Sequence, residues 1–228
     1  MSDRRTATSS PLGRPVGASG AQTRARIIVA AMRCVAEVGY SRATIREIAK
    51  AAEMTSGSLY HYFPNKSALL AATAQHIDEI AAARLRAAAA LAGDAMDRME
   101  AVLDEMHGLL REYPHLAAFD RAMRAEGAAH PRRGRARNPG LKALRDIIDQ
   151  ILDEARARNT LPPDTEPDGA VDAIYALARG LMERAAHLTP DAYAATLVSA
   201  KELIRGTLFA PQASRRGSTP QRRSKRDP

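Results

Sequence analysis

The stretch TSGSLYHYFPNK, residues 55–66, concentrates aromatic side chains in a chain that has very few of them. A histidine and three aromatic residues are consecutive at 60–63, whereas only 4% of the 228 residues are Phe, Trp or Tyr and none is Trp. Thr55 is a favourable N-cap and Pro64 cannot continue a helix. The stretch therefore predicts a short helix over 56–62.

The two sides of this predicted helix differ in chemistry. Leu59, Tyr62 and Phe63 are spaced by three and four residues, which is typical of a packed face. The opposite side offers small residues, hydroxyls and polar-tipped rings, which suit close approach to a phosphate or a base edge. Its members are Ser56, Gly57, Ser58, Tyr60 and His61. Asn65 then predicts the cap of a helix starting at Lys66, and a helix N-terminus with an added lysine suits a phosphate.

A second short helix is predicted just upstream. Thr44-Ile-Arg-Glu47 has the spacing of a capping box, which predicts a helix over about 45–52. A turn follows, and Thr55 caps the next helix. Two short helices joined by a three- or four-residue turn have the dimensions of a helix-turn-helix.

Before this pair, the periodicity predicts a helix over about 24–38. Thr23 is expected to cap it, and Gly39 to end it as a C′ glycine. Cys34 falls on the apolar face and is expected to be a core residue rather than a reactive thiol. Pro, Gly and Ser crowd residues 9–20, which predicts disorder there.

Beyond residue 65 nearly every segment has helical periodicity, and no alternating strand pattern occurs. The predicted helices are 66–91, 95–112, 115–125, 140–158, 168–187 and 190–209. The fold class is therefore expected to be all-α, with about nine helices.

Composition excludes several classes of protein. No apolar run exceeds six residues, whereas a membrane span needs about 20, so no membrane segment is expected. The N-terminus lacks the apolar region of a secretory signal, and one cysteine excludes an intramolecular disulfide framework. We therefore expect a cytoplasmic protein.

The net charge of +8 is unevenly distributed. Residues 23–72 hold seven basic and three acidic residues, and residues 211–228 hold six basic and one acidic residue. A basic surface favours a polyanion such as nucleic acid. The basic residues at 211–228 are equally typical of a solvated chain end that binds nothing, and this alternative stays open.

Residues 23–70 resemble the DNA-binding domain of the TetR family of bacterial repressors. The matching residues are Gly39, Thr44, Ile48-Ala49, Thr55, Gly57, Leu59-Tyr60, Phe63, Lys66 and Leu69-Leu70. The turn departs from the family pattern, because Ala52-Glu53-Met54-Thr55 stands where Ala-Gly-Val-Ser is common. If φ is positive at Glu53, the missing glycine costs ~1 kcal/mol.

The resemblance implies roles for the residues of the helix-turn-helix. Thr44, Tyr60 and Lys66 are expected to hold phosphates. The residues expected at or near base edges are Arg46, Ser56, Gly57, Ser58 and His61. Thr55, at the start of the second helix, is also counted among the DNA-binding residues. Alternatives remain open: a solvated helix face for Arg46, and packing or capping for His61.

The resemblance also implies a helical ligand-binding and dimerisation domain. The expected pocket wall is Met99, Leu103, Met106, His107, Leu110, Phe119, Met123, Ile148, Ile151 and Tyr175, although such a stripe is equally typical of plain core. The last two helices are expected to form the homodimer, or to be buried within the monomer, through apolar stripes. These are Val171, Ile174, Tyr175, Ala178, Leu181 and Met182, then Tyr193, Leu197, Ala200, Ile204 and Leu208. The arginine-rich loop 126–139 could bind an acidic ligand, or is simply solvated.

An enzyme is the first rival interpretation. Two acidic groups could be drawn as metal sites: Asp146, Asp149, Asp153 and Glu154, and His76-x-Asp78-Glu79. Both have helical surface spacing, so charge pairs explain them better. No phosphate-binding glycine loop, nucleophile elbow or HExxH motif occurs. We therefore expect no catalytic residue, no metal and no cofactor.

The sequence thus predicts a disordered tail (1–22), a helix-turn-helix domain (23–70), a ligand-binding and dimerisation domain (71–210) and a basic disordered tail (211–228). The expected function is a transcriptional repressor that binds a palindromic double-stranded DNA operator as a homodimer. A small apolar or amphipathic effector is expected to release it. The alternative is a transcriptional activator or an architectural DNA-binding protein without a small-molecule ligand.

Overall fold

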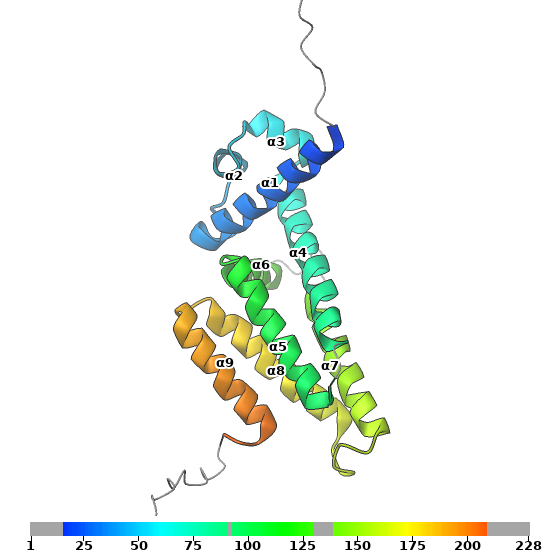
Figure 1. Cartoon of the computed structure of the whole chain (residues 1–228). Helices are drawn as coiled ribbons and strands as arrows, with labels where there is room; N and C mark the ends of the chain where they lie inside the picture. The colour runs from blue at the N-terminus through cyan, green and yellow to red at the C-terminus, as the bar shows by residue number, and fades with distance from the viewer. Residues whose placement is uncertain (1–15, 91–92, 130–138, 209–228) are drawn as a thin grey trace, which may run out of the picture.

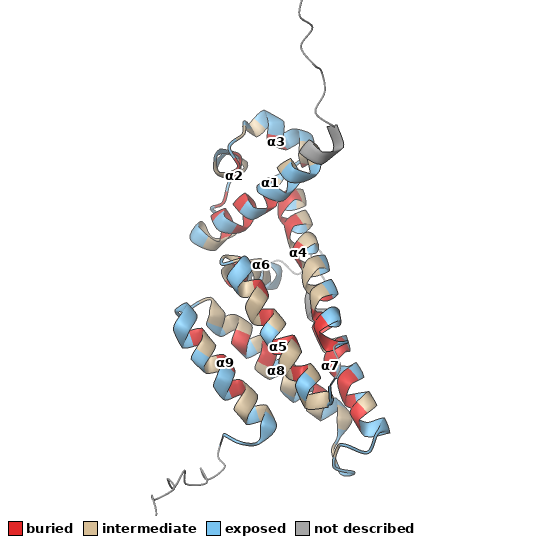
Figure 2. Ribbon diagram, viewed as in Figure 1, coloured by how far each residue is buried: buried red, intermediate tan, exposed pale blue. Residues whose placement is uncertain are grey.

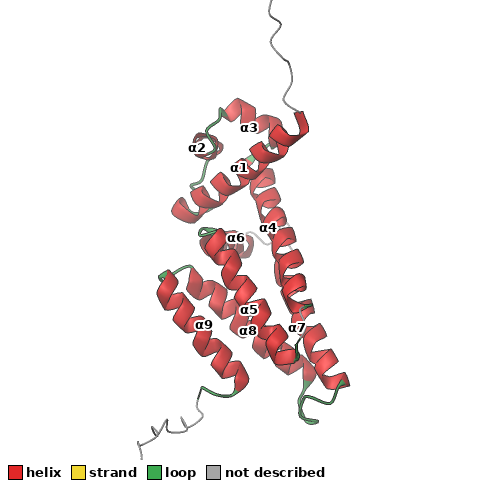
Figure 3. Cartoon of the chain, viewed as in Figure 1, coloured by secondary structure: helices red, strands yellow, loops and turns green. Residues whose placement is uncertain are grey.

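The computed structural model describes residues 16–90, 93–129 and 139–208. Within these residues every regular element is an α-helix (Figure 3). In chain order they are α1 (Val16–Val38), α2 (Ile45–Ala51), α3 (Ser56–Tyr62), α4 (Lys66–Ala89), α5 (Ala95–Glu112), α6 (Leu116–Ala129), α7 (Pro139–Ala157), α8 (Pro167–Ala185) and α9 (Pro190–Arg205). The prediction of an all-α fold with about nine helices is confirmed.

The helices form two groups that are joined by α4. The N-terminal unit, α1–α3, lies at one end of the molecule, and α5–α9 form the larger body (Figure 1). α4 runs from one group into the other and packs against α1, α5 and α7, while α6 also packs against α1. Buried residues lie where these helices face one another (Figure 2). Because α4 is packed along its length, the two groups are linked by core rather than by a free connector.

The helix starts around the N-terminal unit are set by their first residues. The Thr44 hydroxyl accepts from the Glu47 amide at 3.2 Å, and Glu47 Oε2 accepts from the Thr44 amide at 3.0 Å. Thr55 and Asn65 cap α3 and α4 with their own side chains. These caps satisfy amides that the helix cannot pair internally, as the sequence predicted.

The predicted start of the first helix is wrong. α1 begins at Val16, so Thr23 lies inside it and does not cap it, and residues 16–22 of the predicted tail are helical. An N-cap residue is only a preference, and the helix continues upstream where the chain allows it. No proline interrupts residues 16–63, and several residues before Thr23 are alanine or glutamine, which favour helix. Residues 1–15 and 211–228 lie outside the described part of the chain.

Two other helix ends differ from the prediction. α6 continues to Ala129, so the predicted loop 126–139 is helical over its first residues, and its arginines lie outside the described residues. α9 ends at Arg205 because Gly206 adopts φ +72, a left-handed conformation that closes the helix.

Cys34 packs in the core, as its position on the apolar face predicted. The side chain belongs to the main hydrophobic cluster and is only 9% exposed. Burial raises the pKa of its thiol, and the nearby Glu37 carboxylate raises it further. The nucleophilic thiolate is therefore disfavoured in the folded protein.

This environment predicts slow thiol chemistry. At pH 8, DTNB should modify Cys34 at least ~100-fold more slowly in the native protein than in urea, because reaction requires local opening. The rate is measured by absorbance of the released thiolate. Equal rates in buffer and in urea would contradict the buried placement.

The turn between α2 and α3 contains a strained residue. Glu53 has φ +56, in the region that disfavours a side chain, whereas the α1 end places a glycine, Gly39, at φ +82. The backbone angle φ is therefore positive at Glu53, which is the condition under which the sequence predicted a cost for the missing glycine. A charged residue with a Cβ occupies the position where glycine is common in TetR-type turns.

Replacing Glu53 should stabilise the protein. Glu53→Gly is expected to raise the free energy of unfolding by about 0.5–1 kcal/mol. Glycine relieves the left-handed strain in the folded state, but it also gives the unfolded chain more conformational freedom, which offsets part of the gain. Urea denaturation measures it. Glu53→Ala is the matched control, because it removes the charge but keeps the Cβ, and it should give no such gain. An equal gain in both variants would show that charge, not backbone strain, is responsible.

The predicted apolar stripes of α8 and α9 are largely buried within the protomer. Val171 and Leu181 of α8 and Leu197 of α9 are at most 5% exposed. α8 packs against α6, α7 and α9, and α9 against α5, so these faces are already covered. The exposed large apolar side chains of α9 are instead Val198 and Leu203, at 57% and 47%.

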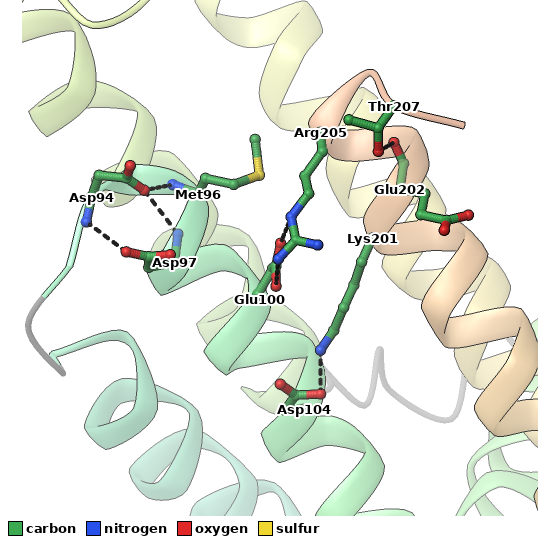
Figure 4. A network of polar contacts seen from close by, with 9 residues as sticks. All are labelled: Asp94, Met96, Asp97, Glu100, Asp104, Lys201, Glu202, Arg205 and Thr207. Atoms are coloured by element: carbon green, nitrogen blue, oxygen red, sulfur yellow. Dashed lines mark hydrogen bonds and ion pairs between the residues drawn. The ribbon is translucent and has the colours of Figure 1, made fainter. Parts of the chain in front are cut away.

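Charge pairs fasten α9 to α5 in addition to this burial (Figure 4). Lys201 Nζ lies 2.5 Å from Asp104 Oδ1, and Arg205 Nη2 donates to Glu100 Oε2 at 2.6 Å. One partner of each pair is largely covered, Lys201 at 16% and Glu100 at 14%, whereas Asp104 and Arg205 are 60% and 48% exposed, so solvent screens these pairs in part. The position of α9 on the body is thus specified by apolar and charged contacts together.

Among the described helices, none is both long and apolar enough to cross a membrane.

Candidate nucleic-acid interface

α2, a short turn and α3 form a rigid pair. Ile48 and Ala49 of α2 and Leu59 of α3 are at most 1% exposed. Phe63, directly after α3, is 3% exposed, and the Arg24 guanidinium of α1 lies 4.8 Å from its ring centroid. α3 is therefore held onto α1 and α2 by its inner face, so its outer face has a defined direction.

The outer face of α3 is open to solvent. Tyr60 is 53% exposed, and Gly57, Ser58 and His61 are also exposed. The His61 ring lies edge-on to Tyr62, with 5.9 Å between ring centroids. This surface presents hydroxyl, phenol and imidazole groups from a fixed helix, as a partner with phosphates and base edges requires.

The other predicted contact residues are distributed around this face. Thr44, Arg46 and Thr55 are exposed, and Ser56 is half-buried. The Thr44 hydroxyl lies 2.9 Å from Glu47 Oε2, so the capping box occupies its donors. The hydroxyls of Thr55 and Ser58 also lie 2.9 Å apart. Capping therefore limits the hydrogen bonds that Thr44 and Thr55 have left for a ligand.

Lys66, expected at a phosphate, is engaged inside the protein. Its Nζ donates to the backbone oxygens of Tyr40 at 2.7 Å and Ser41 at 3.2 Å. The ammonium also lies 4.8 Å from the Tyr40 ring centroid. No pattern in the sequence indicated this contact, because it joins residues more than twenty positions apart.

A narrow apolar cleft lies in the larger body. Its volume is about 80 Å³, and residues of α4, α5, α6, α7 and α8 line it: Ile77, Asp78, Ala81, Leu85, Met106, Leu109, Leu116, Asp120, Leu144 and Met182. A smaller hollow of about 20 Å³ shares four of these residues and adds Ala74, Phe119 and Met123. The two hollows are adjacent, because residues of α4 and α6 line both.

The sequence identified only part of this wall. Met106 lines the cleft, and Phe119 and Met123 line the smaller hollow, as predicted. Seven predicted residues line neither: Met99, Leu103, Ile148 and Ile151, which are buried, and His107, Leu110 and Tyr175, which are half-buried. The prediction missed the contribution of α4, although its buried positions at spacings of three and four were visible in the sequence.

His107, expected in the pocket wall, packs instead against α9. Its ring stacks on Tyr193 with 5.4 Å between centroids. Burial raises the pKa of Tyr193 to about 12, so this phenol stays protonated. The pair belongs to the junction between α5 and α9.

A larger hollow of about 470 Å³ lies elsewhere, between the end of α7 and the loop before α8. None of the predicted ligand or DNA-binding residues lines it. Nearby, Glu154 pairs with Arg98 at 2.6 Å and with Arg158 at 3.6 Å. Within the described residues, no group of three or more His, Cys, Asp or Glu side chains is arranged to hold a metal.

Comparison with known proteins places this geometry in a family. A family model described as "Bacterial regulatory proteins, tetR family" matches residues 27–73. The transcriptional regulator AcuR of Cereibacter sphaeroides is 32% identical over 185 residues, which cover 78% of this chain and 84% of AcuR. The HTH-type transcriptional repressor Rv1474c of Mycobacterium tuberculosis is 41% identical, but over 63 residues that cover only 28% of this chain and 34% of that protein.

Solved structures share the fold over about four fifths of this chain. FadR from Bacillus subtilis, solved in complex with stearoyl-CoA, superposes with a TM-score of 0.69 over 80% of this chain and 98% of that chain, at 22% identity. The ketosteroid regulator KstR2 of Mycobacterium tuberculosis has a TM-score of 0.62 over 81% and 92% of the two chains, at 19% identity. The helix-turn-helix is exposed, the family model matches the N-terminal unit, and AcuR aligns over most of its length. The chain therefore belongs to the TetR family of DNA-binding transcriptional regulators.

Proposed function

We propose that this regulator is a homodimeric repressor that binds a near-palindromic operator and is released by a small apolar or amphipathic effector. The observation that carries the proposal is the course of α4. The helix starts beside α1–α3 and, without interruption, lines the cleft with Ile77, Ala81 and Leu85. One rigid element therefore connects the DNA-binding face to a potential effector site.

On the DNA side, α3 would enter the major groove. We propose that Tyr60 and Thr44 contact phosphates, and that Arg46 contacts a phosphate or a base. The remaining proposed contacts lie along the exposed side of α3 and its N-cap: Thr55, Ser56, Gly57, Ser58 and His61. Phosphate contacts would position the protein, and the contacts of α3 would select the sequence.

On the effector side, the cleft is too small as it stands. Ligand sites commonly have volumes of about 300–1,000 Å³, several times that of the cleft. A guest would have to separate α4 from α6, and α6 packs against α1. The methionines in the wall, Met106, Met123 and Met182, can adapt to a range of apolar shapes. Binding would then favour a second arrangement of α4 and α1, to the extent that the effector prefers it.

The homodimer would form through the outward faces of α8 and α9. Val198 and Leu203 of α9 are exposed apolar side chains. On α8, the small residues Ala173, Ala176 and Gly180 are exposed at spacings of three and four. Small residues allow close approach of a partner helix, and two helices from each copy would make a four-helix bundle.

The test is selection of genomic DNA fragments by the purified protein at near-physiological salt. Recovery of a few fragments that share a palindrome supports the proposal. Weak binding without sequence preference contradicts sequence-specific repression and favours an architectural role. For the effector, a panel of apolar and amphipathic compounds is added to the complex with a recovered fragment. If no compound changes the affinity, the ligand-responsive part of the proposal is lost.

A further inference from the structure

Lys66, the first residue of α4, forms hydrogen bonds to the turn between α1 and α2. An ammonium has three N–H donors, and Lys66 directs its group at two backbone oxygens, those of Tyr40 and Ser41. The Tyr40 ring lies beneath the same nitrogen, with 4.8 Å to its centroid. Charge-assisted hydrogen bonds and a cation–π contact together hold the charge at this place.

The turn that receives these bonds also contacts the core, where Ala43 is 0% exposed and Tyr40 packs against the buried cluster. It starts at Gly39, whose φ of +82 reverses the chain after α1. Its internal support consists of the Ala43 amide bonded to Gly39 O at 3.1 Å and of Arg42 Nε donating to Val38 O at 2.9 Å. Two cations therefore satisfy the carbonyl oxygens at the end of α1, where the helix dipole favours positive charge.

The turn sets the direction in which α2 leaves α1. α2 starts at Ile45, three residues after Arg42, and Arg46 is exposed in its first turn. A change in the turn would reorient α2 and move Arg46 relative to the DNA. Lys66 belongs to α4, so it also fixes α4 to this same turn.

We propose that Lys66 is a positioning residue: it clamps the turn at residues 39–42 to the start of α4, and so places α2 and Arg46, rather than neutralising a DNA phosphate. The inference rests on the DNA-binding role stated under Proposed function. It adds that the charge of Lys66 is used within the protein. Motion of α4 would then carry α1 and α2 with it as one body.

The test compares variants of the full-length chain on a short duplex recovered from the genomic selection. Lys66→Met removes the donors and keeps the stem. We expect it to weaken binding by about tenfold or more, with an unchanged slope of log affinity against log salt. Loss of a phosphate contact would instead lower that slope by about 0.9. Lys50→Met is the matched control, because it removes the same charge from an exposed position on α2.

A second variant separates hydrogen bonding from charge. Lys66→Gln keeps an N–H donor without the charge. A positioning role predicts that it recovers part of the lost affinity at an unchanged salt slope, whereas a phosphate role predicts a slope reduced by about 0.9. If Lys66 acts through Arg46, Lys66→Met should cost much less in an Arg46→Ala background. The inference would be overturned if Lys66→Met lowered the salt slope and also cost as much affinity in the Arg46→Ala background as in the unsubstituted protein. Failure of the unsubstituted protein to bind would instead reject the proposed function.

Discussion

Val198→Asp is expected to convert the proposed homodimer into a monomer and to lower its affinity for the proposed operator by about 100-fold or more. Val198 is the most exposed large apolar side chain on α9, at 57%. In a symmetric interface each copy would contribute the same substitution, so two carboxylates would be buried close together. Loss of the second DNA-binding unit removes the gain from simultaneous contact with two half-sites, which is commonly about 10²–10⁴.

Sedimentation velocity measures the oligomeric state, and titration of a fluorescent operator duplex measures the affinity. Val29→Asp is the matched control, because Val29 is 50% exposed on α1, far from the proposed interface. The control should remain a dimer. If Val198→Asp also stays dimeric at micromolar concentration, the outward face of α9 is not the interface.

Leu59→Ala is expected to lower the free energy of unfolding by about 3 kcal/mol, within the usual 2–5 kcal/mol for a buried leucine. Leu59 is 0% exposed and is the buried residue of α3 itself. Its loss leaves a cavity between α3 and the helices beneath it. Urea denaturation at fixed protein concentration measures the change.

The neighbouring residue provides the control for this prediction. Tyr60 lies next to Leu59 but is 53% exposed, so Tyr60→Ala should change stability by no more than about 0.5 kcal/mol. It should nevertheless weaken DNA binding, if Tyr60 contacts a phosphate as proposed. A large loss of stability in Tyr60→Ala would show that its ring is part of the core and would remove it from the proposed interface.

The local features of the chain were predictable because a few neighbouring residues decide them. Thr44 with Glu47, Thr55 and Asn65 form caps within three residues of their partners. Gly39 ends α1 in a left-handed conformation, and the missing glycine at Glu53 leaves a strained residue in the turn. The period of apolar residues identified the inner face of α3, and hence its exposed face.

Predictions that depended on which helices meet were less accurate. The stripes of α8 and α9 had the correct period, but α5, α6 and α7 cover most of them within the protomer. The same reason explains the cleft, where α4 supplies part of the wall, whereas the prediction had taken the wall only from the segments that form α5, α6, α7 and α8. An apolar stripe indicates which face of a helix is buried, but it does not indicate which other helix covers that face.

By itself, therefore, the sequence determined the all-α fold, the caps of α2, α3 and α4 and the helix-turn-helix, and it indicated the family, but it did not place the start of α1. Only the tertiary structure decided that Lys66 bonds to Tyr40 and Ser41, that His107 stacks on Tyr193, and that Val198 and Leu203 face outward. The physical reason is the range of the interactions. Caps and helical periods act over three or four residues, whereas these contacts join segments 25 or more residues apart and exist only once the helices have packed.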